Sequence, residues 1–125
     1  MNYEEILEYN KRCATFLGAV FYDDDKIAFP EGYYMLDSHE FDLPCQLTDM
    51  SFHSDWNWIM YVIDKIESTN IKKGFGYYYC FKIGYDWCTI EGSDGKIIPT
   101  ICYRNKIEST IQAIDKFLIW YNLQN

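Results

Sequence analysis

The sequence predicts an α+β fold in which three helices pack on one face of a largely antiparallel sheet, in the order α-β(2-3)-α-β-β-β-α. Two observations lead to this class. Apolar residues recur at helical spacing near both ends and in the middle of the chain, and short β-prone runs separated by turn signals lie between. A length of 125 residues is typical of one domain, so residues 1–125 are expected to form a single domain.

The first helix is expected at residues 2–17. Asn2 occupies the N-cap position, Glu5 follows three residues later in capping-box register, and Gly18 lies just beyond the last turn. One face of this segment is marked at helical spacing by Ile6, Asn10, Cys13 and Leu17. The start and stop signals of this helix therefore agree.

A β-rich arm is expected at residues 19–50. The runs AVFY, KIAF and YYML are separated by DDD and PEG and predict two or three short strands. The segment 37–49, which contains Pro44, is expected to be irregular and exposed.

Residues 52–67 form the longest apolar-periodic run and predict a core helix. The apolar stripe of this helix comprises Trp56, Ile59, Met60, Val62, Ile63 and Ile66. Ser54 is the predicted N-cap, and Asp55 places negative charge near the positive end of the helix dipole.

A meander follows, with strands expected at residues 75–83, 85–91 and 97–103. A bend at Gly84 separates the first two strands, and the Asp94-Gly95 pair is a hairpin signal before the third. Pro99 predicts that the third strand is an edge strand, because proline cannot donate a hydrogen bond to a neighbour.

The last helix is expected to begin after Asn105, its predicted N-cap, with Glu108 three positions later. Its apolar face is continuous and comprises Ile107, Ile111, Ile114, Leu118 and Tyr121. Such a face predicts that this helix lies against the sheet.

The net charge of the chain is −8, and all of it lies in the first part of the sequence. Residues 1–50 contain eleven acidic and three basic side chains, whereas residues 51–125 contain eight of each. Such a field repels nucleic-acid phosphates and attracts basic protein surfaces. The alternative is that the acidic loops only keep a chain with twelve Tyr residues in solution.

The acidic β-rich arm is therefore the candidate recognition surface. The residues expected to contact a partner are Asp23, Asp24, Asp25, Glu31, Glu40 and Asp42 as electrostatic contacts, with Tyr33 and Tyr34 as aromatic anchors. The three adjacent aspartates lack the interleaved oxygen ligands and the glycine of an EF-hand loop, so no metal is expected there.

No stretch of the sequence carries a catalytic, nucleotide or metal motif of high specificity. His53, Ser54 and Asp55 have the composition of a catalytic triad, but three consecutive residues at a helix start cannot adopt its geometry. The five Cys residues include no CxxC pair, and GFG at residues 74–76 precedes a strand instead of opening a helix. No catalytic residue, cofactor or metal is expected.

An odd number of cysteines indicates a reducing compartment. The N-terminal segment lacks the features of a signal peptide, and no apolar run reaches the length of a membrane span. A cytoplasmic location in a bacterial host cell, without membrane association, is therefore expected.

The blocks FHSDWNWIMYVIDKIE and NKIESTIQAIDKFLIWYN resemble a family of small uncharacterised proteins encoded by phages and mobile elements of Bacteroidetes. The residues that carry the resemblance are His53, Ser54, Trp56, Trp58, Ile59, Met60, Lys65, Ile66 and Glu67, then Lys106, Ile107, Glu108, Ala113, Phe117, Trp120, Tyr121 and Asn122. The chain departs from the family at Tyr61, where the family often has proline, which predicts a straighter helix. The resemblance implies a small, acidic, non-enzymatic accessory protein of phage or prophage origin.

Together these observations predict a non-enzymatic inhibitor of a host defence system, similar to anti-CRISPR proteins. Its expected partner is a basic nucleic-acid-processing protein, such as a defence nuclease or its guide-RNA complex. Direct binding to nucleic acid is not expected, because only Lys72, Lys73 and Lys82 lie near the aromatic run 75–81. Two alternatives stay open: a structural or housekeeping phage protein that forms homo-oligomers, and a small enzyme that uses His53 or His39.

Overall fold

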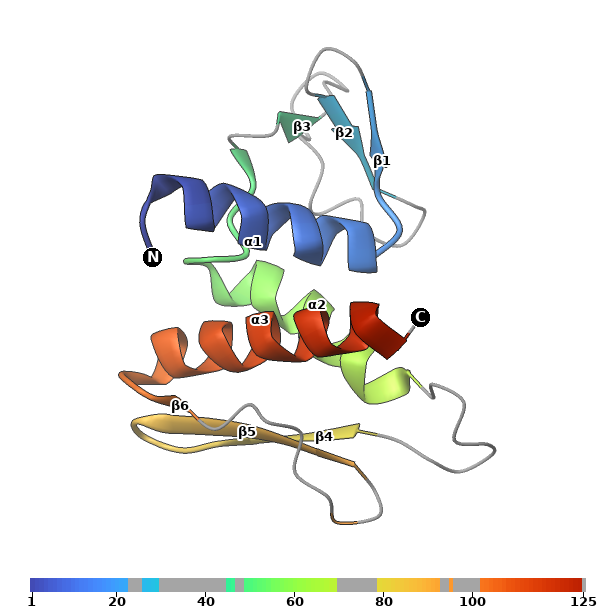
Figure 1. Ribbon diagram of the computed structural model, residues 1–125. Helices are drawn as coiled ribbons and strands as arrows, with labels where there is room; N and C mark the ends of the chain where they lie inside the picture. Colours follow the sequence, from blue (N-terminus) through green and yellow to red (C-terminus); the bar gives the residue numbers. More distant parts are fainter. Residues whose placement is uncertain are drawn as a thin grey trace. The chain divides into compact units, whose positions relative to one another are not determined.

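The computed structural model describes residues 1–22, 26–29, 45–46, 49–69, 79–92, 95 and 102–124. In chain order its elements are α1 (Tyr3–Phe16), β1 (Val20–Phe21), β2 (Lys26–Ala28), β3 (Cys45–Gln46), α2 (Trp56–Ser68), β4 (Tyr79–Ile83), β5 (Trp87–Gly92), β6 (Cys102–Tyr103) and α3 (Lys106–Gln124) (Figure 1). The predicted α+β class and the predicted order of elements are confirmed.

Contacts between Cα atoms divide the chain into two compact units. We call Met1–Tyr61 the N-terminal unit and Val62–Asn125 the C-terminal unit; the boundary falls within α2. The expectation of a single domain stays a prediction. No helix in the described part of the chain is both long and apolar enough to cross a membrane.

α1 begins and ends at the predicted signals. The Asn2 side chain accepts a hydrogen bond from the backbone N–H of Glu5 at 2.8 Å, and the Glu5 carboxylate accepts one from the N–H of Asn2 at 3.2 Å. At the other end, Gly18 has φ of 90°, and the N–H of Ala19 donates to the carbonyl of Ala14 at 3.0 Å. Because glycine tolerates positive φ, Gly18 ends the helix and directs the chain into β1.

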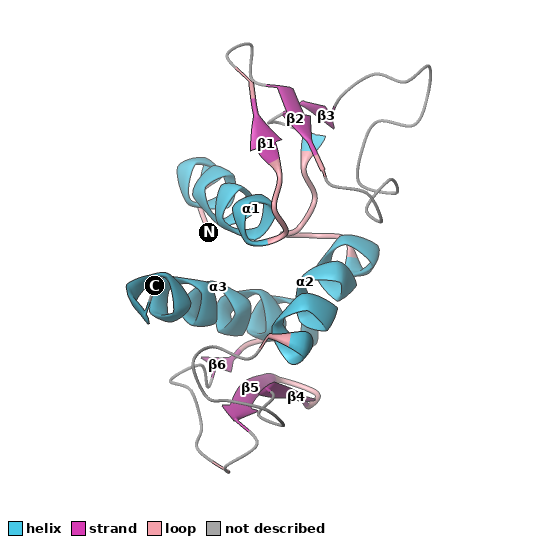
Figure 2. Ribbon diagram, turned by 90° about the vertical axis from the view of Figure 1, so that its right-hand side faces the viewer, coloured by secondary structure: helices cyan, strands magenta, loops and turns pink. Residues whose placement is uncertain are grey.

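β1, β2 and β3 form an antiparallel sheet in that order (Figure 2). β1 and β2 lie in the runs AVFY and KIAF, as predicted, whereas YYML lies outside the described residues. β3 lies within residues 37–49, so the expectation of an irregular segment is wrong for Cys45–Gln46. The pairing of β3 with β2 explains the difference, because so short a strand takes its hydrogen bonds from a distant neighbour.

The N-cap of α2 is Asp55 and not Ser54, so that prediction is corrected. One carboxylate oxygen of Asp55 accepts a hydrogen bond from the backbone N–H of Asn57 at 2.8 Å, and its carbonyl accepts from Ile59 at 3.0 Å. Ser54 instead lies in the turn before the helix, where its N–H donates to the carbonyl of Ser51 at 3.2 Å. A carboxylate caps this helix well because its charge also interacts with the helix dipole.

The buried face of α2 is narrower than predicted. The fully or almost fully buried residues of this helix are Ile59, Val62, Ile63 and Ile66. Trp56 and Met60 are 37% and 45% exposed, so their assignment to the core is wrong. At helical spacing the four buried residues span about 100°, and these two side chains lie just beyond one margin of that arc.

β4, β5 and β6 form a second antiparallel sheet, in the predicted meander order. The bend predicted at Gly84 is present: its N–H donates to the carbonyl of Trp87 at 2.8 Å. A Cβ atom at Gly84 would overlap the Trp87 indole, so this close approach requires glycine. Among the described residues the strands thus form two sheets, whereas the sequence predicted one, because a strand pattern does not specify its partners.

α3 packs on β5 and β6 (Figure 1). The predicted N-cap is confirmed, because the Asn105 side chain accepts a hydrogen bond from the N–H of Glu108 at 2.9 Å. The most buried residues on the apolar face of α3 are Ile111, Ala113, Ile114, Phe117 and Leu118. Tyr79 of β4 packs edge-on against Phe117, with 5.1 Å between the ring centroids, and so ties the helix to the sheet.

Candidate interaction surface

The excess negative charge of the chain belongs to one of its two units. The N-terminal unit contains twelve acidic and three basic side chains, a net charge of −9, whereas the C-terminal unit contains seven and eight, a net charge of +1. At physiological salt the interaction between two exposed charges is largely screened beyond a Debye length of roughly 8 Å. A partner is therefore attracted or repelled mainly by the charges nearest to it. The N-terminal unit is therefore where a basic partner would be attracted.

The residues predicted to contact a partner all lie outside the described residues. They are Asp23, Asp24, Asp25, Glu31, Tyr33, Tyr34, Glu40 and Asp42. Their role stays a prediction. The described parts of the same arm, residues 19–22 and 26–29 above all, provide the geometry of its surface.

β1 and the residue after it expose three consecutive large apolar side chains. Val20 is 53% exposed, Phe21 41% and Tyr22 54%. Consecutive exposed apolar side chains are unusual on a protein surface, and where they occur they often mark a site that binds another molecule. These residues were not predicted as contacts, because AVFY has the sequence pattern of an ordinary short strand.

The backbone of Phe21 points toward the edge of the sheet. The N–H of Tyr22 donates to the carbonyl of Lys26 at 2.9 Å, and the register places Val20 opposite Ala28. In an antiparallel pair hydrogen-bonded positions alternate. The backbone N–H and C=O groups of Val20 and Tyr22 therefore point to β2, and those of Phe21 point away from it. β1 ends the order β1-β2-β3 (Figure 2). Phe21 therefore lies at a free edge of the sheet formed by the described strands.

β2, the strand that pairs with β1, is anchored by buried and packed side chains. Ile27, directly opposite Phe21, is fully buried. Phe29 packs edge-on against Phe52 and Trp58, each at 6.2 Å between ring centroids, and Phe52 meets Trp58 at 4.9 Å. Such aromatic pairs contribute about 0.5–1.5 kcal/mol each beyond the burial of their area. β2, the strand next to β1, is therefore well packed.

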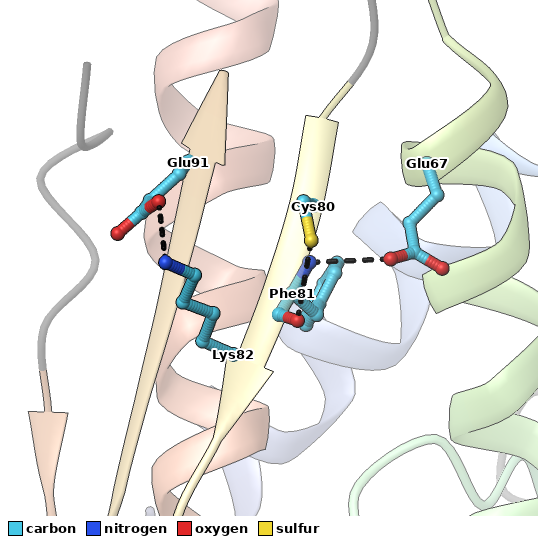
Figure 3. A network of polar contacts seen from close by, with 5 residues as sticks. All are labelled: Glu67, Cys80, Phe81, Lys82 and Glu91. Atoms are coloured by element: carbon cyan, nitrogen blue, oxygen red, sulfur yellow. Dashed lines mark hydrogen bonds and ion pairs between the residues drawn. The ribbon is translucent and has the colours of Figure 1, made fainter. Parts of the chain in front are cut away.

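β4, an edge strand of the second described sheet, is covered by charged side chains. The N–H of Phe81 donates to a carboxylate oxygen of Glu67 of α2 at 3.2 Å, and Lys82 forms an ion pair with Glu91 at 3.1 Å (Figure 3). Charged side chains placed on an edge strand prevent it from pairing with another chain. No described residue covers the N–H of Phe21 in this way.

A polar cluster in the N-terminal unit consists of the buried residues Asn10 and Met50 and the half-buried His53. The Asn10 amide nitrogen donates to the carbonyl of Met50 at 3.3 Å and lies 3.1 Å from Nδ1 of His53. Because an amide nitrogen only donates, this contact is a hydrogen bond when Nδ1 accepts, which is the case in the neutral ring that carries its proton on Nε2. Burial lowers the pKa of His53 below its ordinary value of 6.5, which agrees with this neutral form.

This cluster does not assemble the hydrolytic triad that the composition of residues 53–55 suggests. Nδ1 of His53 is directed to Asn10, and the Asp55 carboxylate caps α2, so the two side chains have separate tasks. Cys13 and Cys88 are buried thiols. Within the described residues no group of three His, Cys, Asp or Glu side chains is placed to hold a metal ion.

Comparisons of the chain with protein-family models, with curated proteins and with solved structures found no match.

Proposed function

We propose that this protein is a non-enzymatic binding protein that captures a basic, nucleic-acid-processing partner through the acidic, aromatic arm at residues 19–50. The observation that carries the proposal is the exposed run from Val20 to Tyr22, presented at a sheet edge and followed in the sequence by Asp23–Asp25. Aromatic side chains are frequent anchors of protein interfaces, and charges around them raise the rate and specificity of association.

The charge of the N-terminal unit supports a partner that normally holds nucleic acid. A net charge of −9 is repelled by phosphates and attracted to the basic channels in which such proteins bind DNA or RNA. Occupation of such a channel by carboxylates and aromatic rings blocks the nucleic acid without any catalytic step.

The resemblance of residues 52–67 and 105–122 to small phage and mobile-element proteins supports the biological setting. In that setting the partner is a host defence nuclease or its guide-RNA complex, and the protein acts as an inhibitor similar to anti-CRISPR proteins. The carboxylates of the arm then form the electrostatic contacts with the partner, and its aromatic side chains are the anchors.

The experiment that tests this proposal is capture of partners by a tagged chain expressed in a related bacterium. Bound proteins are identified by mass spectrometry after washes at about 50 mM and about 200 mM salt, since electrostatic contacts weaken as salt rises. The expected result is one large basic nucleic-acid-processing protein that is lost at the higher salt. Recovery of only the chain itself would contradict the proposal and favour the self-associating alternative.

A matched pair of variants tests whether the acidic arm makes the contact. The first variant carries Asp23→Asn, Asp24→Asn and Asp25→Asn. The control carries Glu4→Gln, Glu8→Gln and Asp64→Asn, three exposed carboxylates outside the arm, and changes the net charge by the same amount. Capture is expected to fail with the first variant alone. Equal capture and equal salt dependence for both variants would show that the arm is not the binding site.

A further inference from the structure

We propose that β1 binds its partner by strand addition, in which an extended basic segment of the partner pairs with the free edge of β1 at Phe21. This inference rests on the proposed function and specifies how the partner is recognised. It concerns the described strand itself and not the predicted contact residues that follow it in the sequence.

The hydrogen-bonding pattern of β1 is suited to an added strand. Val20 and Tyr22 direct their backbone groups to β2, and Phe21 directs its N–H and C=O outward. A partner residue placed opposite Phe21 can therefore exchange two backbone hydrogen bonds without breaking any bond of the present sheet. Glu67 covers the corresponding outward N–H of Phe81 on β4, so the same inference is not drawn for that strand.

The side chains of β1 provide apolar contacts on both faces of an added strand. Successive residues of a strand point to opposite faces, so Val20 and Tyr22 lie on one face and Phe21 on the other. All three are between 41% and 54% exposed, so each still has apolar surface to bury. β2, the neighbouring strand, is anchored by the buried Ile27 and by the packing of Phe29 on Phe52 and Trp58.

Charge decides which strand is added. A second copy of the chain is one occupant that suits a free edge, but pairing of two β1 strands would bring together two units of net charge −9. Each copy would also contribute Asp23–Asp25, which follow Tyr22 directly. Like charges repel and opposite charges attract, so the expected occupant is a segment rich in Lys or Arg.

Amide hydrogen exchange on the full chain, followed by NMR, tests the proposal. The probe is a synthetic peptide of about eight residues in which Lys and Val alternate, a length and pattern typical of one strand. Without peptide the amide of Phe21 is expected to exchange faster than that of Tyr22, which is hydrogen-bonded to Lys26. With saturating peptide the exchange of Phe21 should slow at least about tenfold.

Three results would overturn the proposal. The first is binding of the Lys-Val peptide with no added protection of the Phe21 amide, which would place the peptide elsewhere. The second is equal binding of a control peptide in which Glu and Val alternate, which would remove charge as the basis of selection. The third is protection of Phe21 that needs no peptide and rises with protein concentration, which would make a second copy the occupant.

A pair of variants at one position separates the backbone from the side chain. Phe21→Ala removes the ring and keeps the N–H, whereas Phe21→Pro removes both and leaves the bonds of Val20 and Tyr22 to β2 in place. The Lys-Val peptide is expected to bind Phe21→Pro about tenfold more weakly than Phe21→Ala. Equal affinities would overturn strand addition. If the proline variant does not fold, the exchange experiment on the unmodified chain decides alone.

The same variants distinguish failure of this inference from failure of the proposed function. Capture of a basic partner by Phe21→Pro at the level of the unmodified chain would overturn strand addition and leave the proposed function standing. Protection of Phe21 by the Lys-Val peptide, in a chain that captures no cellular protein, would uphold the strand-addition site and contradict the proposed function.

Discussion

Replacement of Asn10 by aspartate is expected to reverse the pH dependence that His53 gives to the stability of the fold. Asn10 is 2% exposed and donates to the Met50 carbonyl at 3.3 Å, with its nitrogen 3.1 Å from Nδ1 of His53. An aspartate of the same shape has no hydrogen to donate when ionised, so it places a buried carboxylate against two acceptors. A buried charge without its partner costs about 3–5 kcal/mol.

The sign for the unmodified chain follows from the lowered pKa of His53. Below the ordinary value of 6.5, the unfolded chain binds a proton that the folded chain does not, so the contribution of His53 to stability falls as the pH decreases through this range. In the Asn10→Asp variant a protonated His53 gains an ion pair with the new carboxylate, and the pKa of His53 rises above 6.5. A group with a raised pKa in the folded state stabilises the fold at low pH and loses that effect as the pH rises.

The measurement is urea unfolding followed by tryptophan fluorescence at about pH 7.5 and about pH 5.5. Asn10→Asp should destabilise the fold by about 3–5 kcal/mol at the higher pH and recover about 1–3 kcal/mol of this at the lower pH. An NMR titration reports the pKa of His53 directly, with His39→Gln to assign the two histidines of the chain. Greater destabilisation at pH 5.5 than at pH 7.5, or a His53 pKa below 6.5 in the variant, would refute the reasoning.

Three further substitutions, measured by the same urea unfolding at neutral pH, test the C-terminal unit. Phe117→Ala should cost about 3–5 kcal/mol because the ring is fully buried, whereas the control Ile119→Ala, at a position 46% exposed on the same helix, should cost less than about 1 kcal/mol; similar costs would contradict the described packing. Ser109→Ala should cost about 1–3 kcal/mol because it removes a buried hydroxyl that joins the hairpin turn to α3, and an unchanged midpoint would show that this bridge is unimportant. Gly84→Ala should cost about 1–3 kcal/mol and shift the fluorescence of Trp87, whose indole lies where the new methyl group would be; an unchanged spectrum would contradict that contact.

Features that depend on neighbours within a few residues were predicted well from the sequence. The capping box of Asn2 and Glu5, the helix end at Gly18 and the N-cap at Asn105 are all confirmed. Each depends on hydrogen bonds between groups no more than five positions apart, so the residue types and their spacing already contain the information. The cap of α2 was misplaced by one residue because Ser54 and Asp55 are both good caps and adjacent, and only the turn before the helix decides between them.

The charge pattern of the sequence led to the arm at residues 19–50 as the candidate interaction surface, but it did not lead to the exposed residues that the structure describes there. The charge of residues 1–50 led to the arm at 19–50, and the predicted contact residues there lie outside the described part of the structure. Val20, Phe21 and Tyr22 were not chosen, because alternation along a run so short does not show which side chains are exposed. Their exposure depends on β1 ending the sheet order, which involves β2 and β3.

The amino-acid sequence alone was enough to establish the α+β class, the order of the elements, both ends of α1, the start of α3 and the charge difference between the two parts of the chain. These properties depend on composition and on groups that are close in the chain. Tertiary structure decided that the described strands form two sheets and that Trp56 and Met60 lie outside the core. It also decided that Phe21 lies at an edge of the sheet formed by the described strands, whereas Glu67 covers the N–H of Phe81. Strand pairing and burial join residues that are distant in the chain, and a periodic pattern specifies which side of an element is apolar without specifying what covers it.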